Sequence, residues 1–167
     1  MDKFRAATEG MKNVLEDLLH LSRIGRLVNP ESETPFNELV DDVMCLVGGF
    51  LNEKGAQLNV SADLPSVFGD RMRLVELLQN LMENAAKFTG NQSKPALEIG
   101  ASCNGCEDHC YVADNGVGVE KRFHERIFGL FQTLGTQGSG TGVGLALAKK
   151  IVDLHGGVDE QGRGPVT

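Results

Sequence analysis

Two amides and one ammonium group fall at helical spacing near the middle of the chain. Asn80, Asn84 and Lys87 stand at positions i, i+4 and i+7 of the run 70–89, so a helix would carry them along one face. Amides can ligate a metal ion or hydrogen-bond a phosphate, and a lysine supplies the charge that phosphates attract. A solvated polar face has the same spacing, so the other motifs must decide between a ligand site and plain surface.

Two glycine-rich segments follow this run. Residues 114–119 (DNGVGV) put Asp114, Gly116 and Gly118 at the end of a strand-like run, where ligands often bind, although a DNG tripeptide alone is mostly a turn. Residues 138–145 (GSGTGVGL) carry a glycine at every second position before a helical pattern. The free N–H groups of a helix start favour a bound anion. This second segment matches neither GxxxxGK[ST] nor GxGxxG, so it predicts a phosphate cradle of another kind.

The segment 120–137 between the glycine segments mixes charges, apolar residues and glycines. Such a composition suits a mobile lid over a site, with an ordinary surface helix and loop as the alternative. The residues that could anchor a closed lid are Phe123, Phe128, Phe131 and Leu134.

The elements that must position these groups can be read from apolar periodicity. Residues 36–54, 70–89 and 142–154 have helical spacing, and 57–62, 96–102 and 110–113 read as strands. The stripe expected to face the core in 70–89 consists of Leu74, Leu77, Leu78, Leu81, Met82 and Ala85. These elements predict an α+β fold, a two-layer α/β sandwich with a mixed sheet.

A separate helix is expected over residues 2–26. Its apolar residues repeat at alternating spacings of three and four, which is a heptad seam that requires a partner helix; the seam consists of Phe4, Ala7, Met11, Val14, Leu18 and Leu21, widened by Leu15 and Leu19. A single helix packed on a core is the alternative. The polar segment 29–35 reads as a linker, so we expect a helical domain at 1–28, the linker at 29–35 and a second, larger domain at 36–167.

Composition narrows the function classes. The chain has 167 residues, 41% of them hydrophobic, and a net charge of -7, which argues against nucleic acid as a partner. Its longest apolar run, 43–51, is too short to span a membrane, and four cysteines suggest a reducing cytoplasm. Cys103, Cys106, His109 and Cys110 could suggest zinc, but their spacing and the Asn-Gly pair between them favour a hairpin turn.

Four motifs occur in a recognisable order: NLMENAAKFT at 80–89, DNGVG at 114–118, RIFGLF at 126–131 and GTGVGL at 140–145. Together they resemble the four boxes of the ATP-binding domain of sensor histidine kinases, members of the GHKL ATPase superfamily. LLHLSRIGR at 18–26 is similar to the end of the second helix of that family's dimerisation and phosphoacceptor hairpin. The resemblance implies the GHKL (Bergerat) ATP-binding fold, preceded by that long helix.

The resemblance also implies residue roles. It makes Asn84 the ligand of Mg2+, puts Asn80 and Lys87 near the ATP phosphates, and makes Asp114 the acceptor for the adenine amino group. Amide oxygens suit magnesium, and glycine N–H groups can face phosphate oxygens. The ATP-binding residues that it implies are Asn80, Asn84, Lys87, Phe88, Asp114, Gly116, Gly118, Gly138, Gly140, Thr141, Gly142, Gly144 and Leu145.

The reaction implied is transfer of the γ-phosphoryl group of ATP to a histidine in two-component signalling. Hydrolytic relatives carry a glutamate base where Asn80 stands, and an amide cannot deprotonate water, which favours a kinase over an ATPase. Two alternatives remain open: a degenerate scaffold that dimerises without binding nucleotide, and a hydrolytic GHKL ATPase. The expected partners are a second copy, through the hairpin of the full-length protein, and the receiver domain of a response regulator.

Three departures from the family pattern lead to further expectations. None of His20, His109, His124 and His155 stands in an H-[ED]-x-x-[TN]-P motif, so we expect the phosphoacceptor and a sensor region to lie outside this chain. We also expect the family's last strand to be missing. The run LFQTL lacks the lid arginine of some relatives, which leaves Lys121, Arg122 or Arg126 as its replacement. A cytoplasmic location is expected, and the full-length protein could still be membrane-anchored.

Overall fold

The chain divides into two compact units. A computed structural model describes residues 2–24, 29–90, 92–103, 108–132 and 140–156. The larger unit is Asn29–Val119, and the smaller one combines Met1–Val28 with Glu120–Thr167. Among the described residues, no helix combines the length and the apolar character needed to cross a membrane.

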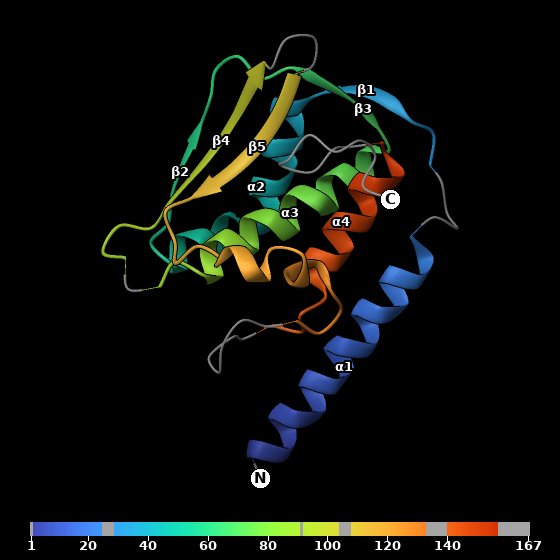
Figure 1. Cartoon of the computed structure of the whole chain (residues 1–167), viewed down its shortest axis with the longest axis vertical. Helices are drawn as coiled ribbons and strands as arrows, with labels where there is room; N and C mark the ends of the chain where they lie inside the picture. The colour runs from blue at the N-terminus through green and yellow to red at the C-terminus, as the bar shows by residue number, and fades with distance from the viewer. Residues whose placement is uncertain (1, 25–28, 91, 104–107, 133–139, 157–167) are drawn as a thin grey trace. The chain divides into compact units, whose positions relative to one another are not determined.

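The larger unit is built on a mixed three-stranded sheet. Strand β4 (Ala96–Cys103) lies in the centre, parallel to β2 (Gln57–Val60) and antiparallel to β5 (Asp108–Asp114). Helices α2 (Phe36–Glu53) and α3 (Arg71–Lys87) lie along one side of this sheet (Figure 1). The predicted α+β class, with a mixed sheet and a helical layer, is confirmed.

The core of this unit lies between the helices and β4. Alternation along β4 buries Leu97 and Ile99 and leaves Glu98 exposed, as one-sided burial of a strand requires. The buried cluster consists of Leu39, Val40, Val43, Val47 and Leu51 from α2, Leu78, Met82, Ala85 and Ala86 from α3, and the two β4 residues.

The expected core stripe of α3 was wrong in two positions. Leu77 and Leu81 are only half-buried and lie outside the core cluster, whereas Val75 and Ala86 pack into it. At 100° per residue the two leucines fall between the core-facing side and the side that carries Asn80. The sequence pattern alone could not separate these neighbouring rows, because all of them are apolar.

The segment 29–35 is not only a linker. It contains strand β1 (Ser32–Pro35), which pairs antiparallel with β3 (Ser66–Gly69) in a separate two-stranded sheet. Neither strand was expected, because each has only four residues and shows no alternating pattern. Their formation depends on pairing between distant segments, which local propensity does not encode.

Asp70 forms the start of α3 and ties it to residue 29. Its Oδ1 accepts hydrogen bonds from the backbone N–H groups of Met72 at 3.0 Å and Arg73 at 3.4 Å. Its Oδ2 accepts from the side-chain Nδ2 of Asn29 at 2.9 Å. With only 4% of Asp70 exposed, this N-cap holds the helix that carries the predicted site.

We expect Asp70→Ala to lower the free energy of unfolding by about 1–3 kcal/mol, because it removes the N-cap and the acceptor of several part-buried donors. Asp63 is an exposed aspartate of the same unit, so Asp63→Ala serves as the control and should change stability by less than about 0.5 kcal/mol. Chemical denaturation of the three proteins measures both effects. Equal unfolding midpoints for Asp70→Ala and wild type would contradict this description of the cap.

The outer face of the sheet carries a tyrosine bound to a glutamate. The Tyr111 hydroxyl donates to Oε1 of Glu98 at 2.6 Å, and the ring lies so close to Gly100 that a Cβ there would meet the phenol oxygen at 2.4 Å. The hydrogen bond to Glu98 is the main cause that raises the pKa of Tyr111 above its ordinary value, followed by desolvation. The folded state therefore favours the neutral phenol.

Titration of Tyr111 can be observed directly, because the chain has one tyrosine and no tryptophan. We expect its phenolate absorbance to appear at a pH above the ordinary midpoint of about 10, and Glu98→Gln to lower that midpoint. The stabilisation from this pair is present below that pH and lost as the pH rises through the folded-state pKa. Glu53→Gln, at an exposed position, should leave the titration unchanged, and a Glu98→Gln midpoint equal to wild type would exclude the contact.

The smaller unit contains helices α1 (Asp2–Arg23) and α4 (Gly144–Leu154) and two short 3-10 helices, η1 (Lys121–Phe123) and η2 (Arg126–Phe128). The long N-terminal helix and the last helix are therefore confirmed. Helix α4 begins two residues later than expected. Gly142 has φ +71, a left-handed conformation that is incompatible with a helix.

The predicted lid segment is described in part. Residues 121–128 form the two 3-10 turns instead of one longer helix. Leu134, expected as a lid anchor, lies outside the described residues, as do the turn 104–107 and residues 157–167.

Candidate functional site

The polar face of α3 is confirmed as a row of part-buried and exposed side chains. Asn80 donates from Nδ2 to the backbone oxygen of Glu76 at 2.8 Å, which leaves its Oδ1 available as an acceptor. The side-chain amide of Asn84 makes no hydrogen bond within the described part of the chain. Lys87 lies one turn further, with Nζ 3.3 Å from Oε2 of Glu83. The Glu83 carboxylate was not identified from the sequence, although its i, i+4 spacing from Lys87 is a signal for such a pair.

The DNG turn at the end of β5 is stabilised by a hydrogen bond between its own residues. Oδ1 of Asp114 accepts the backbone N–H of Gly116 at 2.7 Å, while Oδ2 accepts no hydrogen bond from the residues described. Asn115 fixes the turn to the start of β4: its Oδ1 accepts from the backbone N–H of Ala96 and its Nδ2 donates to the backbone oxygen of Lys94, each at 2.9 Å. Asn115 was also missed, and its place between Asp and Gly in a turn is the signal that could have identified it.

The end of α3 and the DNG turn are brought together. The backbone N–H of Val117 donates to the carbonyl oxygen of Phe88, the C-cap residue of α3, at 3.1 Å. A Cβ added to Gly116 would lie 2.4 Å from the same oxygen and 2.6 Å from Oδ1 of Asp114. Only glycine fits at this junction. Asn84 and Asp114, 30 positions apart in the sequence, are therefore carried by two segments in direct contact.

The second glycine segment belongs to the smaller unit. Gly138 lies outside the described residues, while Gly140, Thr141, Gly142, Gly144 and Leu145 lead into α4. Within the described part of the chain no side chain caps the start of α4, and the first backbone N–H groups of a helix favour an anion.

The turn before α4 is held by the phenylalanine motif. The backbone N–H of Phe131 donates to the carbonyl oxygen of Gly142 at 2.9 Å, and a Cβ at Gly142 would lie 2.8 Å from the carbonyl carbon of Phe131. Phe131 itself has φ +61, an uncommon conformation for a residue with a large side chain. The glycine and phenylalanine motifs therefore form one packed turn within this unit.

Thr141 is engaged by the N-terminal helix of the same unit. Its hydroxyl donates to Oδ2 of Asp17, and Nζ of Lys150 donates to the backbone oxygen of Leu21 at 3.3 Å. Asp17 was not identified from the sequence, because a contact across 124 residues leaves no local signal.

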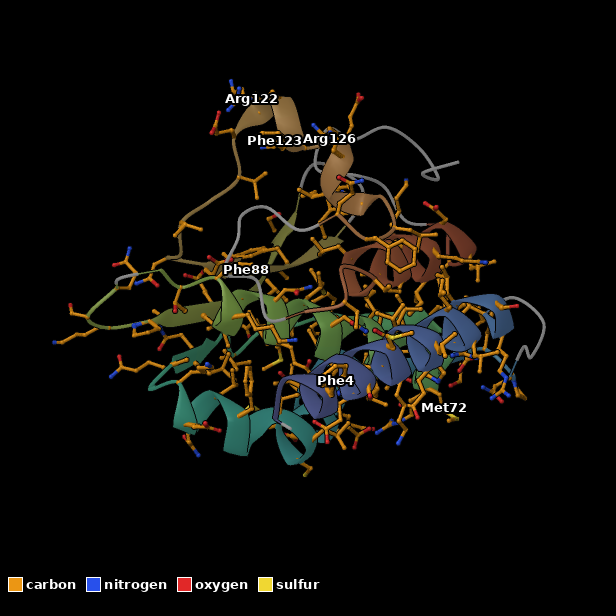
Figure 2. All side chains as sticks on the ribbon, turned by 90° about the horizontal axis from the view of Figure 1, so that it is seen from below. Phe4, Met72, Phe88, Arg122, Phe123 and Arg126 are labelled. Atoms are coloured by element: carbon orange, nitrogen blue, oxygen red, sulfur yellow. The ribbon has the colours of Figure 1, made fainter. Side chains whose placement is uncertain are left out.

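Two of the three candidate cations, Arg122 and Arg126, lie over the same aromatic ring. The guanidinium carbon of Arg122 lies 4.6 Å and that of Arg126 5.6 Å from the centre of the Phe123 ring (Figure 2). Arg122 is also paired with Glu120, with its Nε 3.0 Å from a carboxylate oxygen. Phe123 therefore positions both arginines by cation–π contact.

The cysteine-rich run is described only in part. Cys106 lies outside the described residues, and within the described ranges no three His, Cys, Asp or Glu side chains gather closely enough to hold a metal ion. Residues 96–103 and 108–114 do form the two antiparallel strands of a hairpin, as the Asn-Gly pair predicted.

Comparison with known proteins identifies the family. Residues 69–165 match the family described as histidine kinase-, DNA gyrase B-, and HSP90-like ATPase. The chain belongs to this family. The match includes both glycine segments, the phenylalanine motif and all of α3. The resemblance drawn from the four motifs is thus confirmed.

Relatives within this ATPase family include named histidine kinases. The chain is 38% identical over 158 residues to the methanogenesis regulatory histidine kinase FilI of Methanothrix harundinacea, covering 92% of this chain and 18% of FilI. It is 30% identical to full-length ShkA in complex with AMPPNP, with a TM-score of 0.66, covering 90% of this chain and 32% of that one.

A further structure shares the fold. The histidine kinase AdeS of Acinetobacter baumannii superposes with a TM-score of 0.71 at 20% identity, covering 98% of this chain and 78% of that one. The chain spans about a fifth of the length of FilI and of cyanobacterial phytochrome B of Nostoc, which is also among its relatives.

Proposed function

We propose that this chain is the ATP-binding catalytic part of a two-component sensor histidine kinase, which transfers the γ-phosphoryl group of ATP to a histidine. Membership of the ATPase family and the named histidine kinases among its relatives support this proposal. The observation that carries it is the junction of α3 with the DNG turn, where Val117 binds the carbonyl oxygen of Phe88 and Gly116 has no room for a side chain.

This junction suits an adenine nucleotide with magnesium. Asp114 keeps Oδ1 for the Gly116 N–H, and we assign Oδ2 as the acceptor for the adenine amino group. Phe88, with 38% of its surface exposed, offers an apolar contact, and the Gly116 and Gly118 backbones allow close approach. We assign Oδ1 of Asn84 as the magnesium ligand, because amide oxygens are hard donors. A bound magnesium ion would neutralise phosphate charge during transfer.

The remaining assigned residues act on the phosphate chain. We assign the Asn80 Oδ1 and the Lys87 ammonium to the phosphate end of the nucleotide. Lys87, whose Nζ lies 3.3 Å from Oε2 of Glu83, would either interact with both groups or break its contact with Glu83. The N–H groups of Gly140, Gly142, Gly144 and Leu145 and the hydroxyl of Thr141 supply further donors at the start of α4. Asn80 cannot act as a base toward water, so these residues favour transfer to a histidine over hydrolysis.

The N-terminal helix provides the link to signalling. We assign residues 1–28 as the second helix of the dimerisation and phosphoacceptor hairpin and 36–167 as the catalytic domain, with a receiver domain as the partner in phosphotransfer. The exposed apolar side chains Phe4, Met11, Leu15 and Leu19 support a helical partner for α1. A cytoplasmic catalytic part fits this role, whether or not the full-length protein has a membrane anchor.

Incubation of the chain with radiolabelled ATP and magnesium tests the kinase assignment. We expect bound ATP but no label on the chain, because none of its four histidines lies in an acceptor motif. Phosphate release should be no faster than in Asp114→Asn, the variant expected to bind nucleotide more weakly. Steady magnesium-dependent phosphate release by wild type would favour a hydrolytic ATPase. Labelling of a histidine in the chain would contradict the acceptor assignment, and absence of bound ATP would favour a degenerate scaffold.

A further inference from the structure

We propose that the carboxylate of Asp17 competes with the nucleotide phosphates for the second glycine segment, so that α1 docked in this position keeps the ATP site in a low-affinity state. The inference rests on the proposed function, since it concerns regulation of the same site. Its starting point is the hydrogen bond from the Thr141 hydroxyl to Oδ2 of Asp17.

Two contacts hold α1 in this position. Thr141 binds Asp17, and Lys150, located two turns into α4, donates from Nζ to the backbone oxygen of Leu21 at 3.3 Å. Asp17 and Leu21 are four residues apart and therefore lie on the same side of α1. Both partners belong to the glycine segment and the helix that follows it. The contact is therefore a two-point attachment along one side of the helix.

The burial of α1 agrees with a docked face. Val14, Asp17, Leu18 and Leu21 are partly buried and Ile24 is 3% exposed, and these positions share one side of a helix. Four large apolar side chains of α1 outside this stripe are exposed: Phe4, Met11, Leu15 and Leu19. The predicted heptad seam is thus divided, because Val14, Leu18 and Leu21 in its second half are partly buried whereas Phe4 and Met11 in its first half are exposed.

The charge of Asp17 is the reason why it would compete with the nucleotide phosphates for Thr141. The start of α4 has no side-chain cap and its free N–H groups attract negative charge. In this structure the anion next to that segment is a carboxylate of the chain itself. A phosphate brought to Thr141 would meet the negative charge of Asp17, and the Thr141 hydroxyl, which already donates to Asp17, would not be available as a donor. Nucleotide binding therefore requires Asp17 to leave, and nucleotide in turn favours the undocked helix.

The test compares affinities for the nonhydrolysable analogue AMPPNP with magnesium by calorimetry. We expect Asp17→Ala to bind about 3- to 10-fold more tightly than wild type, since one competing hydrogen bond is removed. Asp17→Asn, which keeps the size but not the charge, should show an intermediate gain. Glu16→Ala is the matched control: Glu16 is a neighbouring acid on α1, 62% exposed and 3.7 Å from Lys12. It should bind like wild type.

Adenosine serves as a second probe, because it lacks phosphates. Its affinity should be the same in wild type and Asp17→Ala, so a gain for adenosine equal to that for AMPPNP would contradict competition with phosphate. A readout without nucleotide tests the docking itself. We expect faster amide hydrogen exchange in the second half of α1 for Asp17→Ala than for wild type or Glu16→Ala.

The possible results distinguish failure of this inference from failure of the proposed function. Faster exchange with tighter AMPPNP binding supports the proposal. Unchanged exchange, or faster exchange with unchanged affinity, overturns it while leaving the ATP site intact. Absence of AMPPNP binding in every variant would contradict the proposed function, and with it this inference, whatever the exchange shows.

Discussion

Asp114→Asn should weaken binding of AMPPNP with magnesium by about 10- to 100-fold. The substitution replaces the carboxylate oxygen assigned to the adenine amino group by an amide, which removes the charge and presents a donor to a donor. The fold should tolerate it, because an asparagine Oδ1 can still accept the Gly116 N–H that Asp114 accepts at 2.7 Å. Calorimetric titration measures the affinity.

The control for Asp114→Asn is Asp41→Asn, at an exposed position of α2, which should bind like wild type. Thermal unfolding of both variants without nucleotide shows that the comparison concerns the site and not the fold. Equal AMPPNP affinity in Asp114→Asn and wild type would remove the adenine assignment.

Gly116→Ala should abolish measurable nucleotide binding and destabilise the larger unit. A Cβ at this position would lie 2.4 Å from the Phe88 oxygen and 2.6 Å from Oδ1 of Asp114, and both neighbours are fixed by the turn. Relief requires breaking the junction between the DNG turn and α3, including the hydrogen bond from Val117 to Phe88. We expect a loss of stability of about 1–3 kcal/mol.

Substitution of a second glycine, Gly49, by alanine should raise the stability of the chain instead of lowering it. Gly49 lies in the interior of α2, where it is exposed and has open space for an added methyl group. Gly49→Ala should therefore stabilise the chain by about 0.5–1 kcal/mol and leave AMPPNP binding unchanged. Denaturant midpoints and calorimetry on both variants test the contrast. If Gly116→Ala behaves like Gly49→Ala, the close junction does not exist in solution.

The elements that could be predicted are those with a local pattern. Alternation of Leu97 and Ile99 with Glu98, and helical spacing through α2 and α3, predicted the layers because burial on one face imposes these periods. Strands β1 and β3 could not be predicted, since neither shows an alternating pattern and each pairs with a segment far away in the chain.

In the candidate site, too, the features with a local sequence pattern could be predicted and the long-range contacts could not. The types and spacing of Asn80, Asn84 and Lys87 predicted the polar face correctly, and the four motifs predicted the family. The orientation of each side chain was not accessible: the Asn80 amide bound to the Glu76 oxygen and the Lys87 ammonium beside Glu83 depend on rotamer choice. The bond between Thr141 and Asp17 joins residues 124 positions apart, which no periodicity can reveal.

The proposed function requires that the nucleotide contact residues 114–118 and residues 140–145. Backbone amide NMR spectra recorded during titration with AMPPNP and magnesium test it most directly, because they report each segment separately. We expect saturable shifts at the amides of 114–118 and 140–145, with little change at β1 and β3. Shifts confined to other residues, or no shifts at either glycine segment, would contradict the claim.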